Sequence, residues 1–349
     1  MPSAKPREKT NATQGRTRPL ARALAFVIRT GLTLVIVALV AYFVDWSQFL
    51  QTIQSVHLPT LFLAGLLGCG DRVLMSYKWG LLLRVQGVPL SLWQNLSVYS
   101  ASALAGMVLP STVGGDALRA IWMSRRGAQA AAVTSSVVFE RLIGFAVASL
   151  FGIAGITYLF LLGDRAGPLR TIFGLLLALT AALLLGLMLS FSGFLTKRFG
   201  QLLKTYVSER LFDIIQPFHR AYTAYRYAPG PVGAFVGLSV LRQFVMLAVD
   251  YTVVLALGLD VGPATVCAAL AVTFMIARIP IAVTDIGLQE GVLILLLLPA
   301  GLQPADIVAM SAVVRILSIV VVGGNTLAAL LTGTIDSATF RRRAVVSSD

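Results

Sequence analysis

Long apolar stretches alternate with short polar segments along most of the chain. An α-helix needs about 20 apolar residues to cross the hydrocarbon core of a bilayer. Stretches of roughly this length or somewhat longer lie at about 24–44, 59–83, the 130s to 162, 168–192, 231–258 and 306–333. The pattern predicts an all-α polytopic membrane protein with about six full transmembrane helices.

One further apolar stretch predicts a different element. Residues 92–109 are apolar enough to enter the bilayer, but Arg119, Arg125 and Arg126 follow soon after and favour the cytoplasm. A re-entrant hairpin that enters and leaves on the cytoplasmic side satisfies both demands, because irregular backbone at membrane depth is tolerated where protein or water covers it. Residues 263–300 predict a second hairpin, which mirrors the first across the membrane.

The same pattern divides the chain into a membrane domain with a polar tail at either end. Residues 1–23 predict a disordered basic cytoplasmic tail, 24–335 a single membrane domain and 336–349 a second cytoplasmic tail. Within the membrane domain, two similar sets of elements and one basic amphipathic segment on the cytoplasmic surface are expected. They are repeat A at about 59–162, repeat B at about 231–333 and the amphipathic segment at 193–228.

Composition and charge agree with a membrane protein. The chain is 57% hydrophobic, has a mean hydropathy of +0.84 and carries a formal net charge of +13. Its basic residues concentrate in the two tails and in 193–228, which is the positive-inside pattern and not a nucleic-acid-binding pattern. We therefore expect cytoplasmic termini and no nucleic-acid partner. Lys78 lies near enough to the inner end of its span to snorkel, and Cys69 and Cys267 are read as packing residues.

Charged side chains inside the apolar spans recur in two matched sets. Each set has an arginine 38 residues before a proline, a polar turn that the proline opens, and a second arginine after the turn. The sets are Arg72, Pro110 and Arg141, and Arg242, Pro280 and Arg315. A charge at mid-bilayer costs at least ~2.5–3.5 kcal/mol on insertion scales. Two such sets on oppositely facing halves favour a transporter built from inverted repeats.

The first turn has the residues of a broken-helix binding site. Pro110 ends one half-helix by removing a backbone donor, and Gly114 and Gly115 permit positive φ and close backbone approach. The free N–H groups that begin the second half-helix attract an anion such as a phosphate. The alternative is a packing kink capped by Asp116, but a kink does not need a carboxylate inside the membrane. The binding site, with Arg119 beside it, is favoured.

Glu140 and Arg141 are poor partners for each other, because adjacent helical side chains point about 100° apart. We expect each to reach another element, with Arg141 directed toward Asp116 and Glu140 toward Arg119. The alternative places both at the cytoplasmic interface, where water solvates them.

The second turn carries a comparable group of residues. Arg278, Asp285 and Glu290 flank it, and Pro280 and Gly287 supply its geometry. The residues favour a binding role, and a local ion pair is the alternative.

Three of the arginines are most simply interpreted as the lining of a polar cavity. Arg72, Arg242 and Arg315 each offer a planar fork that donates two hydrogen bonds to a phosphate. The alternative is structural pairing with Asp71, Asp250 or a backbone carbonyl.

Several motifs are absent from the sequence. It has no GxxxxGK[ST] loop, no His/Cys metal cluster and no GxSxG elbow. His57 and His219 fall in loop or surface positions. We expect no metal, no cofactor, no catalytic residue and no enzymatic activity.

The order of the motifs resembles that of a known family. The chain reads Leu109-Pro-x-x-x-Gly-Gly-Asp-x-x-Arg119, then Glu140-Arg141, then Pro280, Gly287-x-x-Glu290 and Arg315. Over roughly residues 20–335 it is similar to the flippase-like membrane region of lysylphosphatidylglycerol synthases and their stand-alone relatives. The resemblance implies a bacterial inner-membrane protein that moves a lipid between leaflets. Some relatives are labelled glycosyltransferases or hopanoid-associated, so the substrate class stays open.

In the synthases a soluble aminoacyl-transferring domain follows the membrane region, and we expect no such activity from a chain that ends at Asp349. The leading hypothesis is a flippase for a phospho- or glycolipid whose anionic or zwitterionic head group binds some of the arginines. Asp116, Glu140 and Glu290 would balance these charges, and one of them would carry a proton if transport is driven. The alternatives are a membrane transferase that uses Asp116 or Glu290 as base, and a scaffold for lipid-synthesising enzymes.

Overall fold

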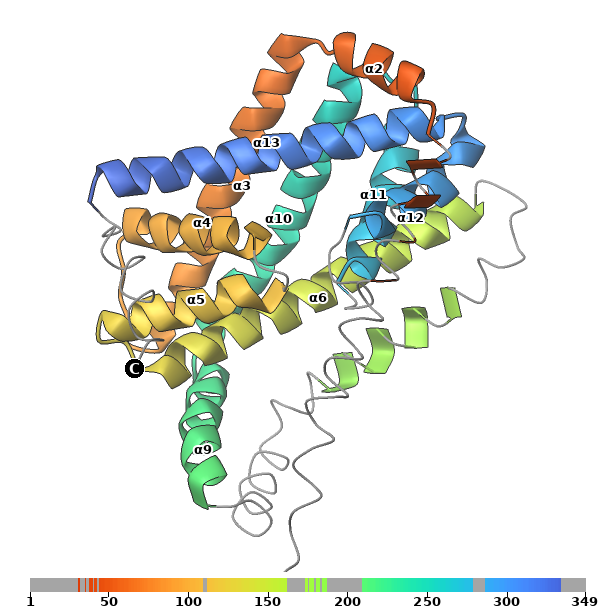
Figure 1. The fold of residues 1–349 in the computed structure, drawn as a ribbon. Helices are drawn as coiled ribbons and strands as arrows, with labels where there is room; N and C mark the ends of the chain where they lie inside the picture. Colours follow the sequence, from red (N-terminus) through yellow and green to blue (C-terminus); the bar gives the residue numbers. More distant parts are fainter. Residues whose placement is uncertain are drawn as a thin grey trace, which may run out of the picture.

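The computed structural model describes residues 44–108, 112–161, 209–278 and 286–333, with isolated positions between 31 and 42 and between 173 and 186. Every regular element in these ranges is a helix (Figure 1). The spans predicted at 24–44 and 168–192 lie largely outside the described residues. So do both hairpin tips, at 109–111 and 279–285, which include Pro110, Pro280 and Asp285.

Four helices are long and apolar enough to cross a membrane. Their apolar runs make each of them a predicted span, and their ends fall within a few residues of the predicted ones. At 1.5 Å per residue a 28-residue helix is about 42 Å long, which exceeds the ~30 Å hydrocarbon core and permits a tilt. The helices are α3 (Leu58–Val85), α6 (Ala130–Leu161), α10 (Pro229–Ala256) and α13 (Pro304–Leu331).

Four shorter helices form two pairs. They contain between 10 and 17 residues, fewer than a full crossing needs. Within each pair the two helices pack against each other, as a hairpin requires. The first pair is α4 (Leu92–Val108) and α5 (Thr112–Arg125), and the second is α11 (Pro263–Ile276) and α12 (Leu288–Leu297).

Gly115 brings α4 and α5 together. A Cβ at this position would lie 2.5 Å from the carbonyl oxygen of Ser102, so no larger residue fits at this separation. Gly114 and Gly115 permit positive φ, but neither adopts it, because α5 begins at Thr112 and both glycines lie inside it. Close backbone approach is therefore the role that the structure supports, and a small residue at a helix contact is its usual cause in membrane proteins.

The contacts between helices come in matched pairs. If α3, α4, α5 and α6 are exchanged with α10, α11, α12 and α13 in that order, the pattern of packed helices is unchanged. For example, α4 packs on α13 and its counterpart α11 packs on α6. Each short pair therefore packs through one of its helices against a long helix of the other half.

The two central helices, α3 and α10, run antiparallel. The His57 N–H donates to the Ala256 carbonyl at one end of the pair (2.7 Å). The Arg242 guanidinium donates to Asp71 near the middle (3.0 Å), and Lys78 Nζ donates to Ser239 Oγ farther along (3.2 Å). Figure 1 shows both helices passing behind α13.

Lys78 does not snorkel as expected. Lys78 is only 2% exposed, and its ammonium lies 4.9 Å from the centre of the Phe235 ring on α10. The packing of α10 against α3 encloses it, which the position of Lys78 in its own span does not reveal.

Charges of opposite sign gather at opposite ends of the helices. At one end, Gln86 Nε2 donates to the Ala221 carbonyl and Trp93 Nε1 donates to Thr332 Oγ1, which joins the end of α3 to α9 (Glu209–Ala224) and the start of α4 to the end of α13. This end carries Arg84, Arg125, Arg126 and Arg226, the last in the 3-10 helix η1 (Tyr225–Tyr227). In Figure 1, α9 projects from the body here.

The other end carries acidic residues and a helix that the sequence pattern did not predict. Asp45 accepts hydrogen bonds from the Ser47 and Gln48 N–H groups and so begins α2 (Trp46–Gln54). Thr52 Oγ1 donates to Asp306 Oδ1 (2.8 Å), which ties α2 to the start of α13. Asp260 lies in the loop before α11 at this same end.

Candidate functional site

A cavity of ≈ 640 Å³ lies between the two sets of helices. Ligand-binding pockets typically measure about 300–1,000 Å³. Residues from both sets line it, so it belongs to their interface. Its charged lining consists of Arg72, Arg119, Arg242, Arg315, Asp71, Asp116 and Asp250.

The cavity reaches the outer surface of the helices. Met107, Ile286 and Ile319 line it and are also 48%, 48% and 51% exposed. An apolar rim beside a charged interior allows a polar group to enter sideways while an attached hydrocarbon chain stays outside.

Two arginines meet one carboxylate in the lining of the cavity. Arg242 Nε donates to Asp71 Oδ1 at 3.0 Å, and Arg72 Nη2 lies 3.8 Å from Asp71 Oδ2. The arginine side chains are 13% and 18% exposed, so both still face the cavity. The two sequence interpretations of Arg242, as a lining residue and as a structural partner, therefore both hold.

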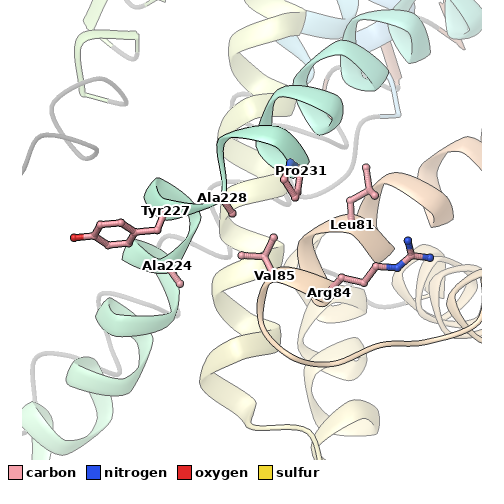
Figure 2. A pocket seen from close by; sticks show the side chains of 7 residues that line it. All are labelled: Leu81, Arg84, Val85, Ala224, Tyr227, Ala228 and Pro231. Carbon is pink, nitrogen blue, oxygen red and sulfur yellow. The ribbon is translucent and has the colours of Figure 1, made fainter.

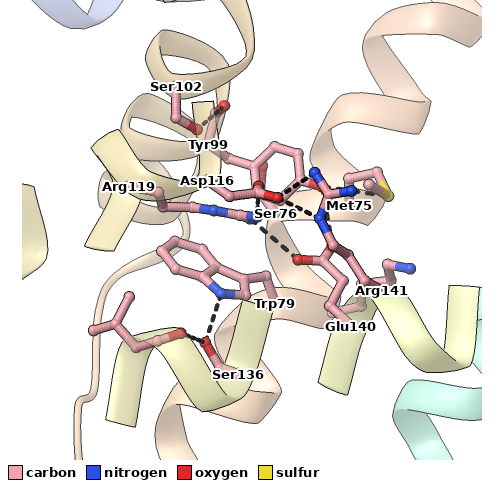
Figure 3. A network of polar contacts seen from close by, with 12 residues as sticks. Met75, Ser76, Trp79, Tyr99, Ser102, Asp116, Arg119, Ser136, Glu140 and Arg141 are labelled. Atoms are coloured by element: carbon pink, nitrogen blue, oxygen red, sulfur yellow. Dashed lines mark hydrogen bonds and ion pairs between the residues drawn. The ribbon is translucent and has the colours of Figure 1, made fainter. Parts of the chain in front are cut away.

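Arg119 is enclosed by protein groups (Figure 3). Its Nη2 donates to Asp116 Oδ1 at 2.6 Å and its Nη1 to Glu140 Oε2 at 3.1 Å. The guanidinium carbon also lies 4.8 Å and 4.6 Å from the ring centres of Trp79 and Tyr99. Arg119 is only 4% exposed, so its neighbours bind it and little of its surface is accessible to a ligand.

The pairings predicted for Glu140 and Arg141 are confirmed. Glu140 receives Arg119 and also the Tyr99 hydroxyl, which donates to Oε1 at 2.9 Å. Arg141 forms a close ion pair with Asp116 Oδ2, and its side chain remains 48% exposed. The alternative in which water solvates both residues is wrong for Glu140, which is 6% exposed.

The second set contains an equivalent ion pair. Arg315 donates through Nη2 (3.0 Å) and Nε (3.2 Å) to Glu290 Oε1. Arginine and acid are 25 residues apart here and also in the Arg141–Asp116 pair. Gly287, the residue before α12, has φ +84° and donates its N–H to Glu290 Oε2 (2.6 Å), which holds the carboxylate at the helix start.

The structure thus sorts the predicted site residues into three groups. Those that line the cavity are Arg72, Gly115, Asp116, Arg119, Arg242 and Arg315. Those that contact a lining residue from behind are Glu140, Arg141 and Glu290. Gly114, Arg278 and Gly287 are described but do not line it, and Arg278 lies instead near Gly144 of α6.

Sequence reasoning missed the aromatic part of the site. Trp79 also donates from Nε1 to Ser136 Oγ (3.1 Å), so its ring is fixed between α3 and α6. Aromatic residues are common in apolar spans, and nothing near Trp79 or Tyr99 in the sequence distinguishes them. Only the packing of α3, α4 and α5 brings them to Arg119.

A second cavity, of ≈ 470 Å³, lies where α9 and η1 meet α3 and α10 (Figure 2). Its lining is mostly apolar, with Leu81, Val85 and Pro231 among the contributors and Arg84 as the charged one. It lacks the clustered charges of the central cavity. Among the described residues, no group of three metal-binding side chains occurs in either place.

These features define a multi-pass helical membrane protein with a charged cavity between its spanning helices. The chain matches the family described as the lysylphosphatidylglycerol synthase TM region over residues 24–324. It belongs to that family, as the order of its motifs predicts. A comparison with curated proteins found no match.

Proposed function

We propose that this protein moves a polar-headed lipid between the leaflets of a bacterial inner membrane and has no catalytic role of its own. The single observation that carries the proposal is the central cavity, which both helix sets line with arginines and which opens beside an apolar rim. Membership of a family associated with lipid modification or transport agrees with it.

The charge inside the helices favours an anionic head group, or the phosphate of a zwitterionic one. Apart from α9 and the charged residues at the basic and acidic ends, the described residues of the spanning helices and short pairs include seven basic side chains against five acidic ones. A phosphate would satisfy this excess, and guanidinium groups are suited to it because they donate in pairs. The basic side chains are Arg72, Lys78, Arg119, Arg141, Arg242, Arg278 and Arg315, and the acidic ones are Asp71, Asp116, Glu140, Asp250 and Glu290.

The helix arrangement supports alternating access. We infer that the two helix sets are inverted repeats, since α3 and α10 are antiparallel counterparts and the other contacts among the eight helices exchange with them. The paired short helices would then be re-entrant hairpins from opposite sides, because the start of α4 and the end of α5 lie at the basic end, whereas the start of α11 and the end of α12 lie at the acidic end. Rocking of one repeat against the other would expose the cavity to each leaflet in turn.

The distribution of surface charge supports an orientation. Arg84, Arg125, Arg126 and Arg226 would face the cytoplasm, since short cytoplasmic loops carry an excess of basic residues. Asp45, Asp260 and Asp306 would face outward. Both termini would then be cytoplasmic.

The test is a leaflet-resolved assay in proteoliposomes that contain fluorescent phosphatidylglycerol as probe. Fluorophores in the outer leaflet are quenched with a membrane-impermeant reductant, and the rate at which protected probe becomes accessible is measured. We expect wild-type protein to move the probe, and Arg315→Gln to lose most of that activity because its cation is required. Arg226→Gln is the matched control, since Arg226 is exposed and remote from the cavity.

A double variant separates charge from packing. Arg315→Gln leaves Glu290 with an unneutralised charge, so its inactivity alone has two explanations. In Arg315→Gln/Glu290→Gln both partners are neutral, and the local structure is expected to recover. If this double variant regains wild-type transport, the arginine is needed only to neutralise Glu290. The proposed role in lipid binding would then be wrong.

A further inference from the structure

Asp250 is an isolated acid inside the membrane part of the protein. It lies on α10, is 6% exposed and lines the central cavity. Within the part of the chain that the structure describes, it forms no hydrogen bond and no ion pair. The other acids in these helices, Asp71, Asp116, Glu140 and Glu290, are each within 4 Å of an arginine.

The groups around Asp250 leave its charge uncompensated. Arg242, on the same helix, is the cation that acts on it most, but its Nε is already bound to Asp71 on α3. Asp71 itself repels a negative charge at Asp250. Cys267 of α11 lies near it and offers no positive charge. Across the cavity, Arg72 lies near Asp71 and Arg315 is paired with Glu290.

An unpaired carboxylate is costly where water is scarce. Removing an ion from water costs several kcal/mol unless a partner compensates it, and a carboxyl group avoids this cost by taking up a proton. Each of the other four acids has an arginine within 4 Å that compensates its charge. Asp250 also has access to the cavity, so a proton can reach it.

We propose that Asp250 is the proton-binding site through which a proton gradient drives transport. The proposal rests on the proposed function and specifies its energy source. It assigns the proton to a residue other than Asp116, Glu140 or Glu290, the acids that the sequence favoured for this role.

The charge balance gives the direction of coupling. The cavity lining holds four arginines and three aspartates, an excess of one positive charge when all are ionised. Protonation of Asp250 raises this excess to two and frees Arg242 from its second negative neighbour. Affinity for an anionic head group therefore rises when Asp250 is protonated and falls when it is ionised. Proton and anionic lipid should move in the same direction.

The first experiment measures transport of fluorescent phosphatidylglycerol at several pH values and under imposed pH gradients. We expect the wild-type rate to depend on pH and to increase when the gradient and the lipid movement run in the same direction. Asp250→Asn should lose both dependences, because an amide cannot release a proton. Asp260→Asn is the matched control, since Asp260 is an exposed loop residue and its loss should change neither. An Asp250→Asn variant that keeps the wild-type dependence overturns the proposal.

The second experiment needs no transport. A protonated carboxylic acid in an apolar site adds to dicyclohexylcarbodiimide, which forms an O-acylisourea that rearranges to a stable N-acylurea without a leaving group. Mass spectrometry of the purified full chain should find this adduct on the peptide with Asp250, and its yield should fall as the pH rises. Asp250→Asn should remove it.

The two experiments together separate the possible failures. Absence of the adduct at every pH would mean that Asp250 is a permanent anion, for example one that binds a cationic part of the head group, and would overturn the proposal. If wild-type protein moves no lipid at any pH, the proposed function fails, and the labelling result alone decides whether Asp250 binds a proton.

Discussion

Arg119 should be the arginine whose loss most weakens the fold. Its two Nη atoms are bound to Asp116 and Glu140, and its guanidinium lies over the rings of both Trp79 and Tyr99. Arg119→Gln would leave Glu140 as a buried charge with only the Tyr99 hydroxyl as donor. Breaking a buried ion pair in this way costs about 3–5 kcal/mol, and each lost ring contact adds about 0.5–2 kcal/mol.

The free energy of unfolding can be measured by denaturant titration in mixed micelles, followed by tryptophan fluorescence. Arg119→Gln should lower it by at least about 3 kcal/mol. Arg226→Gln, an exposed control, should change it by less than about 0.5 kcal/mol. The double variant Arg119→Gln/Glu140→Gln should recover part of the loss, because it no longer buries an unpaired charge.

The reasoning would be refuted if Arg119→Gln were as stable as Arg226→Gln. It would also be refuted if the double variant lost as much free energy of unfolding as the two single variants together, or more. The two side chains would then not be each other's partners. Either result would mean that Arg119 is not held by the acids beside it and remains available to a ligand.

Two further predictions concern the contacts that position the cavity. Gly115→Val should force α4 and α5 apart, because a Cβ would meet the Ser102 carbonyl oxygen at 2.5 Å. The same titration should show the free energy of unfolding lowered by about 1–3 kcal/mol. Gly70→Ala should be tolerated, because a Cβ there meets nothing within 4 Å. Asp45→Ala should loosen α2, measured as faster hydrogen exchange in residues 46–54. The Ser47 hydroxyl, with the Gln48 and Ser47 N–H groups, lowers the pKa of Asp45 below its ordinary 3.8. A carboxyl group whose pKa is lower in the folded state stabilises that state at pH values above its unfolded-state pKa. The protection in wild type should therefore be complete at neutral pH and disappear as the pH falls below 3.8 through the folded-state pKa, and Asp45→Ala should lack this transition.

Hydropathy predicted the long helices well, because a span needs a nearly continuous apolar run and little else in the sequence produces one. The pairing of Arg141 with Asp116 and of Glu140 with Arg119 was also predictable. These residues lie on helices that follow one another closely, and adjacent positions on one helix cannot satisfy each other. Local rules are sufficient in both cases.

Features that depend on distant packing were not predictable. Lys78 is buried because α10 lies against it, and α10 begins some 150 residues later in the chain. Asp250 was considered only as a partner for arginine, and the structure assigns that arginine to Asp71 instead. Nothing in the sequence indicates whether the Arg242 guanidinium binds Asp71 or Asp250.

The single acid between Arg72 and Arg242 makes the two halves of the protein unequal. With the counterpart of Arg72 at position 242, that of Asp71 is Leu241, which is 49% exposed and uncharged. A perfectly symmetric pair of repeats would have inward-open and outward-open forms of equal energy. Asp71 removes that degeneracy, because it stays with one half while it binds an arginine of the other. Under the proposed alternating access, the resting protein should therefore favour one orientation of its cavity even in a membrane with identical leaflets.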